Sequence, residues 1–315
     1  MQKDLKFVVI TRETLLEELI KRYNTLEQAR FYVTHLGEDF EEYQRQHREY
    51  RLSLEQTLHL LREKGRVQVI ERRYLPNFLF GTDDIVVVVG RDGLVANTMK
   101  YLTSQKVIGI NPDKRLWDGV LLPFDPSSLK KVLPDILREK REIREITMAK
   151  ASLKNGQHLY AVNDLFIGPK SHTSAKYRLF FDKTEESQSS SGIIVSTGLG
   201  STGWLKSILC GAFGIVNGAK KLPPQAETVF KDSSPSLSWD SPELIFSVRE
   251  PFPSRSSGVS CVFGSIDSSR PLRLISYMPE NGVIFSDGIE NDFLEFSSGM
   301  EACITVADRR GHLVV

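Results

Sequence analysis

The sequence has few cysteines and almost no net charge. Its 315 residues include three cysteines, Cys210, Cys261 and Cys303, and none of them forms a CxxC pair. This spacing excludes a disulfide framework and a cysteine-rich zinc module, and it is typical of a protein of the reducing cytosol. The 41 Lys and Arg residues balance 40 Asp and Glu residues. We therefore expect neither a nucleic-acid partner nor a membrane partner, because proteins that coat either surface depend on a strong basic excess.

Long apolar runs and metal-ligand spacings are also lacking. The N-terminal apolar stretch covers only residues 7–10, and the longest run in the chain covers residues 85–89. Both are shorter than the core of a secretory signal and far shorter than a membrane span. The six histidines form no HxH, HxxxH or HExxH pair, so no residue is assigned as a metal ligand. These absences predict a cytoplasmic protein.

The first part of the chain alternates strand and helix patterns. Residues 85–89, Ile-Val-Val-Val-Val, are all β-branched, which predicts a strand buried on both faces, as in a parallel sheet. A helix to Leu102 and a second buried strand over residues 107–111 complete a βαβ unit. Further strands are predicted over residues 7–10 and 67–70, and further helices after Thr14 and over residues 26–36, 38–63 and 127–141. One of these helices carries an apolar stripe with helical spacing, which predicts core packing: Phe40, Tyr43, His47, Tyr50, Leu54, Leu58 and Leu61.

From about residue 142 onward the pattern becomes predominantly β. Strands are predicted over residues 142–149, 157–167, 175–181, 193–197, 244–248, 272–278, 283–286 and 304–307. The Asn155-Gly156 and Asn281-Gly282 pairs predict tight turns, and the serine-rich residues 228–270 predict loops. The sequence therefore predicts an α/β domain with a parallel sheet over residues 1–141, followed by a β-rich domain over residues 142–315.

The segment Gly90-Arg91-Asp92-Gly93 follows the buried strand over residues 85–89. Ligands of open α/β sheets bind at the carboxyl ends of the strands, where glycines let the backbone approach a phosphate. A carboxylate in such a turn can accept a proton from a substrate hydroxyl. An ordinary βα turn has the same composition, so this motif alone leaves ligand binding and simple chain reversal equally open.

Two further segments combine polar side chains with the ends of predicted strands. Asn163-Asp164 follows an apolar strand and is suited to ribose hydroxyls or an amide ligand, although an Asx turn has the same composition. Residues 191–204 lead from a strand through a loop rich in glycine and hydroxyl groups into a helix, a pattern that can bind phosphate or ribose oxygens. No lysine follows the final glycine where a Walker loop requires one, and a plain flexible loop is also rich in Ser and Gly.

Taken in order, these segments resemble the motifs of NAD kinases, whose superfamily also contains diacylglycerol-type lipid kinases and phosphofructokinases. The family's GGDGT motif is here Gly90-Arg91-Asp92-Gly93-Leu94, and its Asn-Glu pair is Asn163-Asp164. Its Asp-Gly-(apolar)3-Ser-Thr-Pro-Thr-Gly-Ser-Thr-Ala-Tyr motif corresponds to residues 191–204, and its Gly-Ile-Asn to residues 109–111. The resemblance covers residues 83–210, whereas the helical N-terminal segment matches no motif.

The resemblance implies a kinase that transfers a phosphoryl group from ATP, or another phosphate donor, to a hydroxyl of NAD or a related ribose-containing acceptor. The α/β domain would hold the nucleotide and the β-rich domain the acceptor, with the site in the cleft between them. Asp92 would be the general base, and Gly90 and Gly93 would shape a cradle for phosphates that carry a divalent cation such as Mg²⁺. The acceptor's ribose would be held by Asn163 and Asp164, and nucleotide would be contacted by Thr197, Gly200, Ser201 and Thr202. The resemblance also implies a homo-oligomer.

The chain departs from the family motifs at several positions. Arg91 replaces a glycine and would be strained if that position required a positive φ, whereas its guanidinium is suited to binding phosphate. Leu94 and Leu199 each replace a threonine, and Asp164 replaces a glutamate. Two alternatives therefore stay open: a kinase for a sugar or polyol hydroxyl, and a nucleotide-binding sensor without catalysis. A kinase requires that Asp92 and Asp164 line one cleft, and we expect the Arg91 side chain to point into it.

Overall fold

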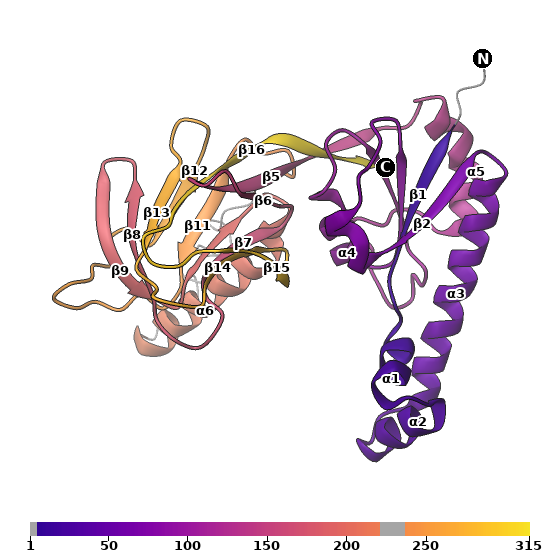
Figure 1. The fold of residues 1–315 in the computed structure, drawn as a ribbon, viewed down its shortest axis with the longest axis horizontal. Helices are drawn as coiled ribbons and strands as arrows, with labels where there is room; N and C mark the ends of the chain where they lie inside the picture. Colours follow the sequence, from indigo (N-terminus) through magenta and orange to yellow (C-terminus); the bar gives the residue numbers. More distant parts are fainter. Residues whose placement is uncertain (1–4, 221–236) are drawn as a thin grey trace. The chain divides into compact units, whose positions relative to one another are not determined.

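The structure, a computed structural model, describes residues 5–220 and 237–315. The chain divides into two compact units (Figure 1): unit 1 comprises Met1–Arg144 and Gly311–Val315, and unit 2 comprises Glu145–Arg310. The predicted second domain, residues 142–315, differs from unit 2 at its C-terminus. There the strand β16 (Glu301–Val314) pairs first with an antiparallel strand of unit 2 and then, at His312 and Leu313, in parallel with a strand of unit 1.

Unit 1 is built on a parallel sheet with the strand order β2-β1-β3-β4. The strands are β1 (Lys6–Thr11), β2 (Arg66–Glu71), β3 (Ile85–Val89) and β4 (Lys106–Ile110). The side chains of β3 from Val86 to Val89 are fully buried, as its unbroken run of β-branched residues predicts for a strand covered on both faces.

Helices cover both faces of this sheet. They are α3 (Phe40–Arg62), α4 (Asp92–Met99) and α5 (Pro126–Leu137). Figure 1 shows α4 on one face and α3 with α5 on the other. The predicted stripe of α3 contributes Tyr50, Leu54 and Leu61 to the core beneath α3 and α5.

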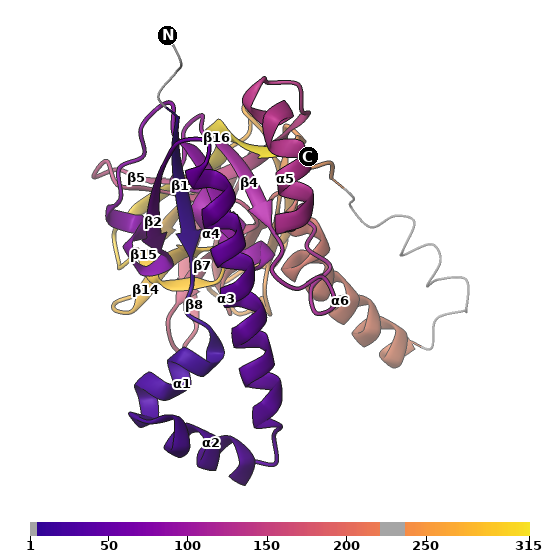
Figure 2. The same cartoon turned by 90° about the vertical axis from the view of Figure 1, so that its right-hand side faces the viewer.

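The N-terminal helices form a small core of their own. Figure 2 shows α1 (Leu15–Tyr23) and α2 (Leu26–His35) beside the first turns of α3, beyond the end of the sheet. Thr14 and Glu17 form the capping box that the sequence predicts for α1. A short 3₁₀ helix, η1 (Arg72–Asn77), follows β2.

Unit 2 contains two antiparallel sheets that pack face to face around an apolar core. One sheet has the order β12-β11-β10-β7-β14-β15. The other contains β16-β13-β8-β9, and in it β5 pairs with β16 and β6 pairs with β5. The strands of the first sheet are β7 (Asp164–Pro169), β10 (Ile193–Ser196), β11 (Leu244–Val248), β12 (Phe263–Ile266), β14 (Gly282–Ser286) and β15 (Ile289–Glu295). The second has β5 (Ile143–Leu153), β6 (His158–Ala161), β8 (Ala175–Phe181), β9 (Thr184–Ser190) and β13 (Leu272–Ser276). A short 3₁₀ helix, η2 (Gly200–Thr202), and the α-helix α6 (Trp204–Lys220) follow β10.

The single strand predicted over residues 157–167 is wrong, because the chain changes sheets within it. β6 pairs with β5 in one sheet, and β7 pairs with β10 and β14 in the other. The break falls at Val162 and Asn163, between the two strands. Their backbone N–H groups donate hydrogen bonds to the carboxylate of Asp287. Because the apolar character of this stretch is continuous, the sequence pattern did not indicate the change of sheet.

The sequence patterns did not predict β9, β12 or β15. β9 has the sequence Thr-Glu-Glu-Ser-Gln-Ser-Ser and becomes a strand by pairing along its whole length with β8. β12 lies within residues 228–270, which were predicted to be loops; residues 228–236 of that range lie outside the described residues. In the described parts of the chain, no helix has both the length and the apolar character needed to cross a membrane.

Candidate functional site

The turn of residues 90–93, which was predicted to bind phosphate, lies at the carboxyl edge of the sheet in unit 1. β1, β3 and β4 are parallel neighbours, so all of them end at this edge. β1 is followed by Arg12, β3 by the turn of residues 90–93, and β4 by Asn111. α4 begins at Asp92, which places its N-terminal N–H groups at the same edge.

The carboxylate of Asp92 is fixed through one of its two oxygens. Its Oδ1 accepts a hydrogen bond from the backbone N–H of Leu121 at 2.6 Å. Its Oδ2 accepts no hydrogen bond from any residue that the structure describes. The first contact orients the carboxylate, and the second oxygen can accept a proton from a hydroxyl group.

Arg91 occupies its position without backbone strain. It is the N-cap residue of α4 with φ −117° and ψ 163°, which is extended backbone, so the strain considered for an arginine in place of glycine does not arise. Its guanidinium carbon lies 3.8 Å from the centroid of the Trp117 ring, a distance at which a cation is attracted to the ring face. Burial, and in addition the charge of Arg12, lowers the pKa of the Arg91 guanidinium.

The two glycines of the turn differ in their surroundings. A Cβ atom on Gly90 would lie 2.8 Å from Leu94 Cδ2, so the end of the Leu94 side chain would have to shift to make room for it. A Cβ atom on Gly93 would meet no atom of the described residues within 4 Å, and Gly93 is exposed. The backbone beside Asp92 is therefore open on the side of Gly93.

The loop that follows β4 supports both Asp92 and Arg91. The Asn111 side chain donates from Nδ2 to the carbonyl of Trp117 at 2.9 Å and accepts at Oδ1 from the N–H of Asp113 at 3.1 Å. A Cβ atom on Gly109 would collide with the Leu121 carbonyl oxygen. The Gly-Ile-Asn sequence of residues 109–111 thus fixes the conformation of the loop after β4. This loop places the Trp117 ring against Arg91 and the Leu121 N–H against Asp92.

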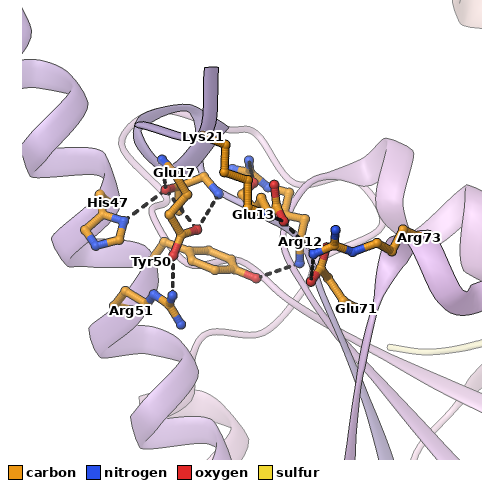
Figure 3. A network of polar contacts seen from close by, with 10 residues as sticks. Arg12, Glu13, Glu17, Lys21, His47, Tyr50, Arg51, Glu71 and Arg73 are labelled. Atoms are coloured by element: carbon orange, nitrogen blue, oxygen red, sulfur yellow. Dashed lines mark hydrogen bonds and ion pairs between the residues drawn. The ribbon is translucent and has the colours of Figure 1, made fainter. Parts of the chain in front are cut away.

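A polar network holds the segment after β1 next to β3 (Figure 3). Tyr50 Oη accepts from the Arg12 backbone N–H at 3.0 Å and donates to the carbonyl of Val89 at 3.3 Å. Around it, Glu13 pairs with Lys21 and Arg73, Glu17 pairs with Arg51, and Thr14 Oγ1 lies 2.9 Å from His47 Nδ1. Because Tyr50 bridges the two strand ends, Arg12 is fixed beside Gly90.

The Asn163-Asp164 pair of unit 2 is positioned by the carboxylate of Asp287. Asp287 Oδ1 accepts from the backbone N–H groups of Asn163 at 2.6 Å, Val162 at 3.1 Å and Asp164 at 3.4 Å. Asp287 has a φ of 53° and is followed by Gly288 with a φ of 69°, in the tight turn between β14 and β15. No motif of the sequence indicated Asp287, because it lies more than a hundred residues after the pair it binds.

Asp164 has a buried carboxyl group whose charge is disfavoured. Only 8% of the residue is exposed. Burial, and secondarily the charge of Asp287, raises the pKa of Asp164 to about 7. Among residues 5–220 and 237–315, no side chain or backbone group donates a hydrogen bond to the Asp164 carboxyl group or binds the Asn163 side-chain amide. Two adjacent polar groups are thus left for hydrogen bonds to a ligand.

The loop after β10 uses its polar groups to hold Asn163 in place. Thr197 Oγ1 donates to the Val162 carbonyl at 2.6 Å, and the Thr197 N–H donates to the Asn163 carbonyl at 2.9 Å. A Cβ atom on Gly200 would collide with the Asn163 carbonyl oxygen. Ser201 Oγ donates to the Gly198 carbonyl at 2.7 Å, and Thr202 is exposed. The predicted contacts of these four residues with nucleotide stay predictions, because most of their polar groups have partners within the loop.

A cavity of about 520 Å³ in unit 2 was not predicted. In its wall the rings of Phe166 and Trp204 are stacked with centroids 5.9 Å apart, and Phe285 stacks on Phe166 at 4.8 Å. Lys170 Nζ lies 3.3 Å from the centroid of the Phe293 ring. No sequence pattern indicated this wall, because single aromatic residues in strands, such as Phe166 and Phe285, are equally expected in a core.

The structure thus gathers the predicted residues in two groups. Asp92, Gly90, Arg91 and Gly93 lie together in unit 1. Asn163, Asp164, Thr197, Gly200 and Ser201 lie together in unit 2. That Asp92 and Asp164 line one cleft stays a prediction, and so does the direction of Arg91 into it.

No protein-family model matches the sequence, and no curated protein matches it. Solved structures do match the fold. Yeast NADH kinase, crystallised with NADH, has a TM-score of 0.58 and 16% identity, and the match covers 100% of this chain and 84% of the yeast chain. An NAD kinase from Archaeoglobus fulgidus, crystallised with ATP, has a TM-score of 0.56 and 16% identity, with 99% and 94% of the two chains covered. The chain has the fold of these kinases, an α/β part and a β-rich part, which confirms the fold class that the motifs implied.

Proposed function

We propose that this protein is a kinase that transfers a phosphoryl group from ATP to a hydroxyl of NAD or a related ribose-containing acceptor. The fold that it shares with an NADH kinase and an NAD kinase supports this assignment. The observation that carries the proposal is Asp92, whose Oδ2 has no partner among the described residues and lies in a turn that Gly93 leaves open. A carboxylate so placed at the carboxyl edge of a parallel sheet suits a general base for a bound hydroxyl.

In the proposed reaction Asp92 Oδ2 accepts the hydroxyl proton while the acceptor oxygen forms a bond to the γ-phosphorus of ATP. The bond from that phosphorus to the β–γ bridging oxygen breaks, and ADP leaves. Such transfer depends on positioning and charge neutralisation more than on covalent catalysis. The guanidinium of Arg91 at the turn contributes to that neutralisation.

The divalent cation of this proposal, such as Mg²⁺, is carried by the donor phosphates. Mg²⁺ in kinase sites is commonly bound by substrate phosphates with one or two carboxylates. In the part of the chain that the structure describes, no group of three or more His, Cys, Asp or Glu side chains is placed to hold a metal ion. The cation therefore enters this proposal as part of the substrate.

Asn163 and Asp164 are the proposed groups for the acceptor's ribose. The amide offers donors and an acceptor, and a carboxyl group with a pKa of about 7 can donate or accept at neutral pH. Both are without hydrogen-bond partners within the described residues. For transfer, the acceptor must contact this pair while its hydroxyl reaches Asp92.

We also expect the active form to be a homo-oligomer, and the protein to be cytoplasmic.

The test is an acceptor panel with the purified full-length protein, MgATP and, in separate reactions, NAD, NADH, a nucleoside, a hexose and a polyol. We expect phosphorylated product from NAD or NADH, measured as NADP or NADPH. Product only from the hexose or the polyol would assign the sugar-kinase alternative. A rise in melting temperature with ATP or NAD but no product from any acceptor would assign the sensor, because binding to the folded state alone stabilises it.

A further inference from the structure

Two arginines lie side by side at the carboxyl edge of the sheet in unit 1. Arg12 follows β1 and Arg91 follows β3, and these strands are parallel neighbours with Ile10 in register with Val88. A Cβ atom on Gly90 would lie 3.8 Å from Cδ of Arg12. The Arg12 side chain therefore lies against the turn that contains Arg91.

Neither arginine has a carboxylate partner within the described residues. The Nε atoms of Arg12 and Arg91 are buried and have no hydrogen-bond acceptor there. Arg12 Nη1 donates to the backbone carbonyl of Glu13 at 3.1 Å, and Arg91 stacks on Trp117. Nearby Arg51 and Arg73, by contrast, form ion pairs with Glu17 and with Glu13 and Glu71. In the network of Figure 3, Arg51 and Arg73 are thus paired with carboxylates, whereas Arg12 is not.

The surroundings of the pair disfavour its positive charge. Burial lowers the pKa of the Arg12 guanidinium, and Arg72 acts in the same direction, while Tyr50, Glu18 and Glu17 oppose it. Burial also lowers the pKa of Arg91, with a further contribution from Arg12 and an opposing one from Glu18. Like charges held together in partial burial favour an anion that satisfies both.

We propose that Arg12 and Arg91 together bind the phosphate chain of a polyphosphate ligand, with Arg12 supplying a guanidinium that lies outside the 90–93 turn. Two guanidinium forks match two phosphate groups, each by paired N–H donors. The N-terminus of α4, which begins at Asp92 beside Arg91, adds N–H groups of the same polarity. The site stands on residues of unit 1 alone, and it rests on the proposed function only for the statement that the polyphosphate belongs to a nucleotide.

The experiment measures the binding of inorganic tripolyphosphate and of MgATP to the full chain by titration calorimetry at constant ionic strength, since exposed charge interactions are screened by salt. The variants are Arg12→Gln and Arg12→Lys. The control is Arg48→Gln, which removes the same charge from an exposed position of α3. We expect Arg12→Gln to weaken tripolyphosphate binding by about 10- to 100-fold, the range for hydrogen bonds to charged groups. The affinity of Arg12→Lys for tripolyphosphate should lie between those of Arg12→Gln and wild type, and the affinity of Arg48→Gln should equal that of wild type.

A second measurement separates binding from folding. Without ligand, Arg12→Gln should melt at the same temperature as wild type or higher, because one of two mutually repelling charges is gone. A residue with a merely structural role would lower the melting temperature instead. Tripolyphosphate binding by Arg12→Gln equal to that of wild type, or no tripolyphosphate binding by wild type, would overturn the site.

The outcomes also distinguish this inference from the proposed function. Arg12-dependent binding of tripolyphosphate without phosphoryl transfer to any acceptor would leave the site intact and remove the kinase. If Arg12→Gln transfers phosphate to NAD and binds tripolyphosphate and MgATP as well as wild type does, the kinase would stand and the site at Arg12 would be removed. Arg12-dependent binding of both tripolyphosphate and MgATP would identify the nucleotide as the source of the phosphates.

Discussion

The two units differ in the ionisable side chains that lack an oppositely charged partner in the described structure. At the sheet edge of unit 1, Arg12 and Arg91 are half-buried cations without carboxylate partners in the described structure. In unit 2, Asp164 is a buried carboxyl group beside a second one, Asp287, which is held by backbone N–H groups. Under the proposed function, the arginines of unit 1 bind an anion, whereas the Asp164 carboxyl group of unit 2, with a pKa of about 7, donates or accepts a hydrogen bond to a hydroxyl group.

The two regions also differ in how tightly their loops are packed. Gly93 leaves open space beside Asp92, whereas Gly200 lies directly against the Asn163 carbonyl. An open turn admits a bulky, charged phosphate chain, and a closed loop holds two small polar groups in a fixed geometry. The proposed function requires this difference between a site for the phosphate donor and a site for the hydroxyl acceptor. The experiments that follow test it, beginning with the strongest effect.

The largest effect is expected for Asp92→Asn in unit 1. The amide keeps an oxygen for the Leu121 N–H but cannot accept a proton, so turnover should fall by roughly 10²–10⁴-fold while MgATP binding is retained. Initial rates of NADP formation measure the effect. Asp118→Asn, in an exposed position of the loop after β4, is the matched control. Turnover of Asp92→Asn within a few-fold of wild type would remove Asp92 from the mechanism.

A large effect of pH is expected in unit 2. Because the pKa of Asp164 is raised from 3.8 to about 7 in the folded protein, the folded state binds more protons than the unfolded state between these values. The contribution of Asp164 to the free energy of unfolding should therefore fall as pH rises from about 4 to about 7, by an amount on the order of 4 kcal/mol. Denaturant unfolding across this pH range measures it, and Asp164→Asn should remove this fall.

Asp287→Asn tests the cause of that pH dependence. Removing the neighbouring charge should move the midpoint of the Asp164 titration to lower pH, because Asp287 contributes to its raised pKa. The titration can be followed by NMR of the Asp164 carboxyl carbon. An unchanged midpoint would show that burial alone holds the proton, and the pairing of carboxyl groups in unit 2 would then have no electrostatic role.

A smaller effect is expected from glycine substitutions that compare the two loops directly. Gly200→Ala places a methyl group against the Asn163 carbonyl and should destabilise the protein by about 1–3 kcal/mol, the cost of overpacking. Gly93→Ala meets no atom within 4 Å and should leave the unfolding free energy unchanged or slightly higher, since it lies in the first turn of α4. Urea unfolding measures both. Equal destabilisation by the two substitutions would contradict the contrast between an open turn and a closed loop.

The smallest effect is expected from Trp117→Leu. The ring face lies 3.8 Å from the Arg91 guanidinium carbon, and its loss should weaken tripolyphosphate binding by about 0.5–1 kcal/mol, the range for an exposed cation–π contact. Tyr74→Leu removes a comparable contact with Arg73 in the same unit and should have no effect on binding. Calorimetry with both variants measures the difference, and equal affinities would mean that Trp117 does not orient Arg91.

Most of the fold class could be predicted because its signals are local. The β-branched run of residues 85–89, the stripe of α3 and the capping box at Thr14 each depend on neighbours a few residues away. β9 could not be predicted in this way, because its polar residues become a strand only through their pairing with β8. The same holds for the break at Val162 and Asn163, where an apolar stretch passes from one sheet into the other.

For the candidate site, the sequence established which residue types are available and in what order: a turn with Asp92, an Asn-Asp pair, and a loop of glycines and hydroxyls. Tertiary structure alone decided which of them share an environment. It placed Arg12 beside Arg91 through the pairing of β1 with β3, and Asp287 beside Asp164 through the pairing of β14 with β7. Burial and charge act through space, so the states of these side chains depend on residues that the chain brings near from tens or more than a hundred positions away.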